Sequence, residues 1–504
     1  MYKHSHEVRV SHSKLPLYVA LASVGIMIVS CTVGPDYKRP SMPLAQSYTR
    51  DSLGPTLSSS VKSGESQQFL IGADIERQWW TAFGSVELNK LVDQAFKNNP
   101  TIESAKATLR QTQENAAAQF GAYFPLVQVG YSASRQKNPV GTLSPTLSSG
   151  DPIYTIHTTQ LSIGYAPDVF GLNRRAVESL TAQSYAQNFQ LQAAYLTLAS
   201  NVVSAAIQEA ALRAQISSAQ KIIDADSRSL KLLQRQAELG SASGLDVASQ
   251  EAFLAQAQQI LPPLNKQLEQ TRNLMAALTG NLPAEGGKDE FDLDKLVLPH
   301  ELPISLPSKL VEHRPDIRAA EEQVHAASAL VGVALANRLP QFSISAAYGG
   351  TSTQFSRMFN TGNTFWGLTG NVAQTVFDFG ALKHKQRAAE AALDQAIAQY
   401  HSVALTAFQN VADSLYALDA DAKGLNAALT SETAATKLLD LTKRQLDAGA
   451  VNALALLNAE MSYQQAKIAR VQYQALRYTD TAALFQSLGG GWQGQIEPTE
   501  KSVH

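Results

Sequence analysis

Residues 404–429 read ALTAFQNVADSLYALDADAKGLNAAL, and the apolar residues of this stretch recur at steps that alternate between four and three. The positions that follow these steps are Ala404, Phe408, Val411, Leu415, Leu418, Ala422, Leu425 and Leu429. Such alternation is typical of a helix that packs along one apolar seam, as in a coiled coil. Residues 212–237 repeat the steps, with the acidic Asp226 at one seam position. The two stretches predict two helices that pack along their length.

The helices that carry these seams are predicted to be long, because proline is absent around them. No proline occurs from Asp168 to Leu261 or from Gln341 to Glu497. The helical pattern of the first stretch extends from Leu172 to Leu239, which corresponds to roughly 100 Å of helix. A helix of that length does not fit inside a globule, so it must lie in a tube, a rod or a bundle.

The chain repeats itself, because the landmarks of one half return in the other half in the same order. Gly171 matches Gly380 and Gly240 matches Gly449, and the members of both pairs are 209 residues apart. Constant spacing of this kind indicates an internal duplication. The sequence therefore divides into a leader, an N-terminal segment, a first repeat, a linker, a second repeat and a tail, at residues 1–30, 31–84, 85–280, 281–305, 306–490 and 491–504.

Each repeat contains two segments in which apolar and polar residues alternate. A period of two predicts a β-strand with one apolar and one polar face. The polar faces are small and neutral, which suits a membrane-spanning strand with a wet inner face. A soluble hairpin on a core is the alternative for any single segment. The four predicted strands lie at about residues 124–135, 157–168, 341–353 and 364–377.

Four strands are too few to close a membrane barrel on their own, since known membrane barrels begin at eight strands. The strands must therefore be pooled across subunits, and three copies would supply twelve. Each repeat also contains a shorter helix before its strands, predicted at about Val86–Gly121 and Pro307–Arg338. The predicted order is helix, strand, strand, long helix, turn and partner helix, twice over.

The leader ends at the only cysteine of the chain. Residues 1–30 combine a positive start with an apolar stretch, as in a secretory signal. Ile28-Val29-Ser30-Cys31 resembles a lipobox, in which the cysteine receives a diacylglycerol and an N-acyl chain and becomes the mature N-terminus. The alternative is a free cysteine just after an ordinary cleavage site. Thr32, rather than Asp, follows Cys31, which in bacterial lipoproteins usually accompanies sorting to the outer membrane.

Composition and motifs argue against several classes of function. The chain has 504 residues, 17% of them charged, and a formal net charge of −2, so it offers no basic field for nucleic acid. A single cysteine excludes an intramolecular disulfide and a multi-cysteine metal cluster. The sequence lacks H-E-x-x-H, G-x-x-x-x-G-K-[ST] and G-x-S-x-G. We therefore expect no enzymatic activity, no metal and no cofactor other than the lipid on Cys31.

Together these features resemble the outer membrane factors, the TolC-like channels, and specifically the lipid-anchored NodT-type efflux lipoproteins. The segment CTVGPDYKRP at residues 31–40 is similar to the opening signature of that branch. Further motifs that resemble those of the branch are Trp79-Trp80, Asn99-Pro100, His313-Arg314-Pro315-Asp316-Ile317 and Phe377-Asp378-Phe379-Gly380. The resemblance extends over essentially all of the mature chain.

The resemblance implies an α+β membrane protein that is internally duplicated and works as a homotrimer. Four transmembrane strands per chain would form a twelve-stranded barrel, continued by a long coiled-coil α-helical barrel with an equatorial belt at the linker. Such ducts sit in the outer membrane of Gram-negative bacteria and extend into the periplasm. They passively conduct substrates that arrive from an inner-membrane pump through a periplasmic adaptor.

In this family the periplasmic helical turns close the pore and contact the adaptor, and here those turns are residues 240–246 and 449–455. Asp246 resembles, by position, an acidic residue that helps to hold the closed aperture. Ser243-Gly244-Leu245-Asp246 is also a capping-box sequence, which stabilises a helix start by about 1 kcal/mol. Where TolC-like channels place two aspartates, this chain has Ala455 and Asn458. The candidate gate or adaptor-contact residues are Gly240, Ser243, Asp246, Gly449, Asn452 and Asn458.

Two other functions remain open at the level of sequence. The first is an exit duct for protein secretion, and the second is a lipid-anchored coiled-coil periplasmic adaptor. An adaptor would normally contain one helical hairpin, whereas this chain has two predicted hairpins and two strand pairs.

Overall fold

The computed structural model describes residues 32–491 except 42–46, 52–53, 138–152 and 287–289, so Cys31 and the leader lie outside the described residues. The chain separates into two compact units. The first unit comprises residues 1–40, 110–185 and 322–398, and the second comprises 41–109, 186–321 and 399–504. Among the described helices, none combines the length and apolar character that a membrane crossing requires.

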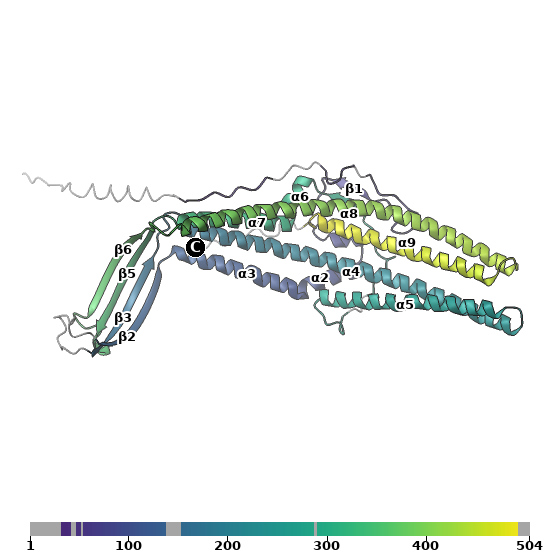
Figure 1. The fold of residues 1–504 in the computed structure, drawn as a ribbon, viewed down its shortest axis with the longest axis horizontal. Helices are drawn as coiled ribbons and strands as arrows, with labels where there is room; N and C mark the ends of the chain where they lie inside the picture. The colour runs from purple at the N-terminus through teal and green to yellow at the C-terminus, as the bar shows by residue number, and fades with distance from the viewer. Residues whose placement is uncertain (1–31, 42–46, 52–53, 138–152, 287–289, 492–504) are drawn as a thin grey trace, which may run out of the picture. The chain divides into compact units, whose positions relative to one another are not determined.

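The four alternating segments form one antiparallel sheet in the first unit (Figure 1). The strands are β2 (Leu126–Lys137), β3 (Ile153–Tyr165), β5 (Gln341–Ser352) and β6 (Thr364–Ala373), in the order β2-β3-β5-β6. Their ends differ from the predicted ends by up to four residues. Strand β6 ends at Ala373, four residues earlier than predicted, and the chain turns further on at Phe379, which adopts a φ of 54°.

The pairing register puts the apolar residues of all four strands in common rows. Val129 pairs with Leu161, Leu161 with Tyr348, and Tyr348 with Trp366. Directly paired residues project from the same face, so this row crosses the whole sheet on one side. The neighbouring row on the opposite face is Gln128, Ser162, Ala347 and Gly367. One face of the sheet is therefore apolar, and the other carries small or neutral polar residues.

The long helices are α4 (Leu172–Glu238) and α8 (Ala381–Asp447), each of 67 residues. Each is followed by a 35-residue partner, α5 (Gly244–Leu278) or α9 (Ala453–Ser487), which completes a helical hairpin (Figure 1). An aspartate caps the start of each long helix. Asp168 accepts hydrogen bonds from the amides of Asn173 and Arg174, and Asp378 accepts them from Gly380 and Leu382.

The predicted seam of α8 is largely buried. Six of its eight positions are buried, and Phe408 and Leu429 are half-buried. Ala407 and Ala428, which directly precede Phe408 and Leu429, are buried in their place. In α4, four seam positions are buried (Leu212, Ala219, Ile223 and Asp226), and the positions nearer the turn are half-buried. The prediction of packed seams is therefore confirmed most fully for α8.

The prediction of one continuous shorter helix in each repeat is wrong. The first is divided into α2 (Val86–Asn98) and α3 (Pro100–Phe120), and the second into α6 (Pro307–His313) and α7 (Pro315–Ala336). The residue before a proline is driven out of the helical region, and both Asn99 and Arg314 are extended. Each proline then starts the next helix, where its missing N–H costs nothing.

Two short strands of the second unit were not predicted. β1 (Gln68–Ile71) lies in the N-terminal segment, and β4 (Glu301–Ile304) lies in the linker. They pair in parallel, with Gln68 opposite Glu301. Beside them the 3-10 helix η1 (Trp79–Phe83) buries Trp79, Trp80 and Phe83 completely or almost so. The aromatic motif Trp79-Trp80 is therefore part of the core.

Arg477, on α9, is completely buried and binds the N-terminal segment to the hairpin. Its guanidinium donates to the carbonyl oxygens of Ser63 (2.7 Å) and Glu65 (2.9 Å) and to the side-chain oxygen of Gln67 (3.1 Å). The neighbouring Tyr478 donates its hydroxyl to the carbonyl of Leu296 (2.9 Å). These bonds satisfy backbone groups of segments that have little regular structure of their own.

We predict that Arg477→Gln lowers the thermal stability of the protein. The shorter amide leaves buried carbonyl groups without donors, which costs about 3 kcal/mol for bonds made by a charged group. Thermal unfolding followed by circular dichroism measures the effect. Lys437→Gln, at an exposed position of α8, is the control and should leave the Tm nearly unchanged. An equal Tm for both variants would contradict the prediction.

Candidate functional site

The two hairpin turns are built alike, and both lie at the same end of the second unit (Figure 1). Gly240 and Gly449 follow the long helices with φ values of 76° and 71°, a conformation that favours glycine. The amide of Gly240 bonds to the carbonyl of Ala237, and the amide of Ser241 bonds to Gln236. Gly449 and Ala450 make the same pair of bonds. Both helices therefore end in a Schellman motif.

The first turn leads into a reciprocal capping box. The Ser243 hydroxyl accepts a hydrogen bond from the amide of Asp246 (3.2 Å), and the Asp246 carboxylate accepts bonds from the amide (3.1 Å) and hydroxyl (2.8 Å) of Ser243. These bonds from Ser243 lower the pKa of Asp246 below its usual value. Asp246 is thus a half-buried anion that also caps the start of α5.

The second turn has a cap but no acid. The Asn452 side chain accepts a bond from the amide of Ala455 (3.1 Å), and Ala455 stands where the first turn has Asp246. Asn458 lies exposed on α9, one turn further along. The structure thus places Gly240, Ser243 and Asp246 on one turn and Gly449 and Asn452 on the other. The two turns share their backbone geometry and differ in charge.

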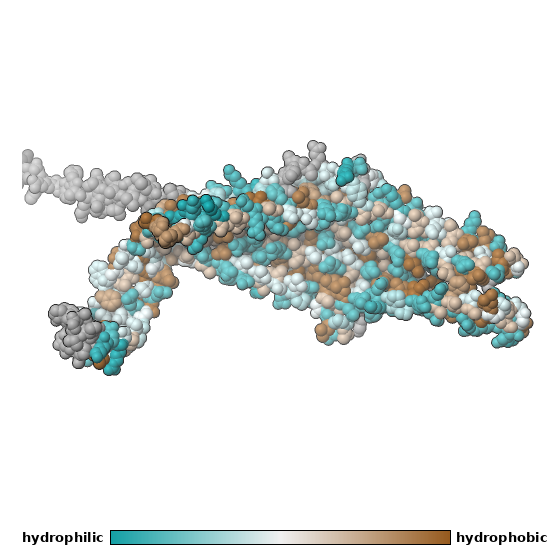
Figure 2. Space-filling model, viewed as in Figure 1, coloured by the Kyte–Doolittle hydropathy of each residue, from teal (hydrophilic) through white to brown (hydrophobic). Residues whose placement is uncertain are grey.

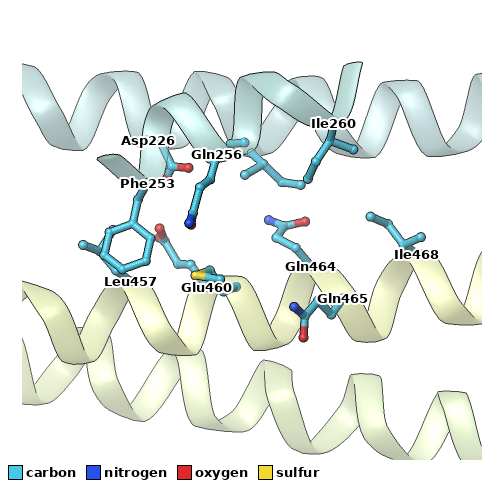
Figure 3. A pocket seen from close by; sticks show the side chains of 12 residues that line it. Asp226, Phe253, Gln256, Ile260, Leu457, Glu460, Gln464, Gln465 and Ile468 are labelled. Atoms are coloured by element: carbon cyan, nitrogen blue, oxygen red, sulfur yellow. The ribbon is translucent and has the colours of Figure 1, made fainter. Parts of the chain in front are cut away.

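A cavity that was not predicted lies between the hairpins (Figure 3). It has a volume of about 100 Å³ and is lined by residues of α4, α5 and α9. Asp226 from α4 and Glu460 from α9 both line it, together with amide side chains such as Gln256 and Gln464. The acidic break in the first seam was the only sequence signal for this cavity, since nothing in the sequence points to Glu460 as its neighbour.

Asp226 and Glu460 form a carboxyl pair. Asp226 is only 6% exposed, and it lines the cavity together with Glu460. Burial raises the pKa of Asp226. Burial and the negative charge of Asp226 raise the pKa of Glu460, against the opposing field of Lys443. A pair of this kind holds a proton that isolated carboxyl groups would release.

The residues that follow Cys31 are held against the first unit. Arg175 is almost fully buried, contacts the carbonyl of Val33 (3.3 Å) and pairs with Asp36 (2.7 Å). Gly34 has a φ of 100°, and a side-chain carbon there would lie 2.4 Å from the Cα of Gly332. The backbone of the N-terminal segment can therefore approach α7 only because both positions are glycine.

No group of three or more potential metal-ligating His, Cys, Asp or Glu residues occurs among the described residues.

The sheet, the duplicated helical hairpins and the capped turns define a class of membrane transport protein, and comparison with known proteins identifies the family. The family model for outer membrane efflux proteins matches the chain twice, at residues 91–281 and 306–490. The chain belongs to the outer membrane efflux protein family. It is an efflux channel protein of the Gram-negative outer membrane.

Curated relatives and solved structures agree with this assignment. The chain is 30% identical to the pyoverdine export outer membrane protein OpmQ of Pseudomonas aeruginosa, over 83% of this chain and 88% of the relative. It is 27% identical to the outer membrane protein OprJ of the same species, over 94% and 96% of the two chains. The structure of the outer-membrane channel OprN is similar with a TM-score of 0.82 and 28% identity, covering 92% of this chain and 100% of that chain.

We predict that Ser243→Ala frays the first turn of α5, because the amide of Asp246 loses its acceptor. Loss of a serine cap costs about 1 kcal/mol locally. Hydrogen exchange at the amides of Asp246 and Val247 should accelerate. In the wild type, the stabilising effect of the Asp246 carboxylate should disappear as the pH falls through its lowered pKa.

Ser249→Ala is the matched control for this variant, because the Ser249 hydroxyl bonds only to the carbonyl of Leu245 within the same helix. Exchange at Asp246 and Val247 should be unchanged in this control. Equal exchange rates in Ser243→Ala and the wild type would show that the capping box does not stabilise the turn.

Proposed function

We propose that the protein is a homotrimeric exit channel of a tripartite efflux system, with a twelve-stranded barrel in the outer membrane. The observation that carries this proposal is the four-stranded sheet with two edges, β2 and β6, that pair with no other described strand. In lipid, unpaired edge groups cost several kcal/mol each, so the sheet must be closed. Because the strands alternate in direction, β6 of one copy and β2 of the next would meet as an antiparallel pair.

The faces of the sheet suit a barrel wall. Exposed apolar side chains such as Val129 (76%) and Trp366 (80%) share the face that would contact lipid. The small and neutral polar residues of the other face would line water. In Figure 2 the visible side of the sheet is mostly white and brown, and teal gathers toward one end of the strands.

The helical hairpins would continue the barrel into the periplasm. There the turns at Gly240 and Gly449 would meet a periplasmic adaptor, which connects the channel to an inner-membrane pump. Relatives that support this arrangement include the toluene efflux pump outer membrane protein TtgF of Pseudomonas putida, which is 28% identical. The substrates we propose are small toxic compounds or drugs. Conduction is passive, and the pump supplies the energy.

Gating would be an iris-like movement of one hairpin against the other. The two turns contribute unequally, because Asp246 offers a negative charge where the second turn has Ala455. Three copies would place three Asp246 carboxylates around the aperture, and the second turn, with Asn452 and Asn458, would add none.

The lipid anchor on Cys31 is a separate part of the proposal. Two observations support it, which are the lipobox sequence and the hydrogen bonds made by the residues directly after it. Arg174 donates to the Thr32 hydroxyl (2.8 Å), and the amide of Val33 donates to the carbonyl of Phe170 (3.2 Å). The described residues directly after the proposed anchor are therefore fixed beside the beginning of α4.

Single-channel recording of the purified protein in planar bilayers tests the duct. The wild type should give small, flickering currents, and Asp246→Ala should lengthen the open periods because the aperture loses its anions. Ser243→Ala is the control, since it removes the cap and keeps the charge. The absence of currents in every variant would overturn the proposed channel, and equal currents in Asp246→Ala and the wild type would restrict Asp246 to capping.

Metabolic labelling with an alkyne analogue of palmitate tests the anchor. The wild-type protein should be labelled, and its mature N-terminal peptide should begin with acylated Cys31. Cys31→Ser should carry no label, because serine offers no thiol to receive the diacylglycerol. An unlabelled wild type, or a mature chain that begins elsewhere, would contradict lipidation.

A further inference from the structure

The carboxyl pair between the two hairpins has no role in the function proposed above. Asp226 belongs to α4 of the first hairpin, and Glu460 belongs to α9 of the second. Figure 3 shows both side chains directed into the cavity that separates these helices. Two ionisable side chains, one from each hairpin, therefore face the same cavity between elements that must separate if the hairpins move as an iris.

Two carboxyl groups that line one cavity can hydrogen-bond to each other only when one of them holds a proton, because two carboxylates offer only acceptors. Asp226 is almost fully buried, and the lining of the cavity includes the apolar side chains of Ile222, Leu457 and Met461. Glu460 is half-buried, so water screens the pair less well than at an open surface, and two negative charges here would repel each other.

The other groups around the pair carry little positive charge that could take the place of the proton. On α5, the uncharged Gln250 donates its amide to the backbone carbonyl of Asp226 (3.2 Å), and Gln256 lines the cavity. Beside Glu460 on α9, Gln464 and Gln465 are also uncharged. The charged group that acts on Glu460 from α8 is Lys443, which is exposed. An exposed ammonium group is screened by solvent and neutralises a buried pair only weakly.

We propose that Asp226 and Glu460 form a proton-binding site that locks the first hairpin to the second and releases it when the shared proton is lost. With one proton bound, the two carboxyl groups attract each other and close the gap between α4 and α9. Without it, like charges face each other across an apolar cavity, and the helices move apart. The consequence for transport rests on the proposed function, because separation of the hairpins opens the aperture.

The direction of the pH effect follows from the raised pKa of both groups. The joined state binds more protons than the separated state, so its stability falls as the pH rises through the range in which the pair titrates. The channel should therefore be more closed at acidic pH and more open at alkaline pH. The Asp246 cap responds in the opposite sense, since its pKa is lowered.

Distance measurement by electron spin resonance tests the lock without reference to conduction. Spin labels are attached through Lys231→Cys on α4 and Ser462→Cys on α9, both at exposed positions, in a Cys31→Ser background so that no other thiol reacts. In the otherwise unchanged protein, the distances should lengthen as the pH rises. Glu460→Gln keeps a hydrogen-bond donor that cannot be titrated away, so the distances should stay short and independent of pH.

Asp224→Asn is the matched control, because Asp224 lies two residues from Asp226, is exposed and bonds to Gln220 of the same helix. This variant should retain the full pH response. A pH response that survives in Glu460→Gln, or that is absent from the parent protein, would overturn the proton-binding site.

Bilayer recordings at the same pH values separate this inference from the proposed channel. Currents that rise with pH in the wild type and lose that dependence in Glu460→Gln support both. Distances that respond to pH in a protein without currents support the site and contradict the channel. Currents without any pH response in the distances or the open periods contradict the site alone.

Discussion

The structure depends on one constraint, which is that every backbone N–H and C=O group of a strand in lipid needs a partner. The inner strands, β3 and β5, are hydrogen-bonded to a neighbour on both sides. The outer strands, β2 and β6, each have one edge that pairs with no other described strand. In the proposed trimer, the edges of neighbouring copies would pair and close the sheet. The apolar row from Val129 to Trp366 suits such a closed wall, in which one face would contact lipid and the other would contact water.

Duplication gives the two repeats the same helix ends, and the two copies differ in charge at their turns. Asp168 and Asp378 start the long helices in the same way, and Gly240 and Gly449 end them in the same way. The caps then diverge, since Ser243 is paired with Asp246 and Asn452 has no acidic partner. A shared backbone with different charges allows one hairpin to carry electrostatic contacts while the other repeats only its geometry.

Much of this architecture follows from local pattern, and the remainder depends on contacts between distant residues. The seams, the strand alternation and the turns at Gly240 and Gly449 are all encoded within a few residues, so they could be predicted. Pro100 and Pro315 are visible in the sequence, but the prediction continued each helix through its proline. Strands β1 and β4 are only four residues long, so no periodic pattern marks them, and they lie on opposite sides of the whole first repeat in the sequence. The contacts of Arg477 and the meeting of Asp226 with Glu460 likewise join residues far apart in sequence, which pattern alone does not reveal.

The equal lengths of α4 and α8, and of α5 and α9, also limit how such a chain can change during evolution. Deleting one residue from a long helix rotates everything beyond it by about 100°, which turns the buried seam toward solvent. A tolerated insertion or deletion would therefore comprise about seven residues, with a compensating change in the partner helix. The second hairpin would have to change by the same amount for both turns to remain level. Divergence in helix length should thus be rare and coordinated, whereas single substitutions on the exposed faces can accumulate freely.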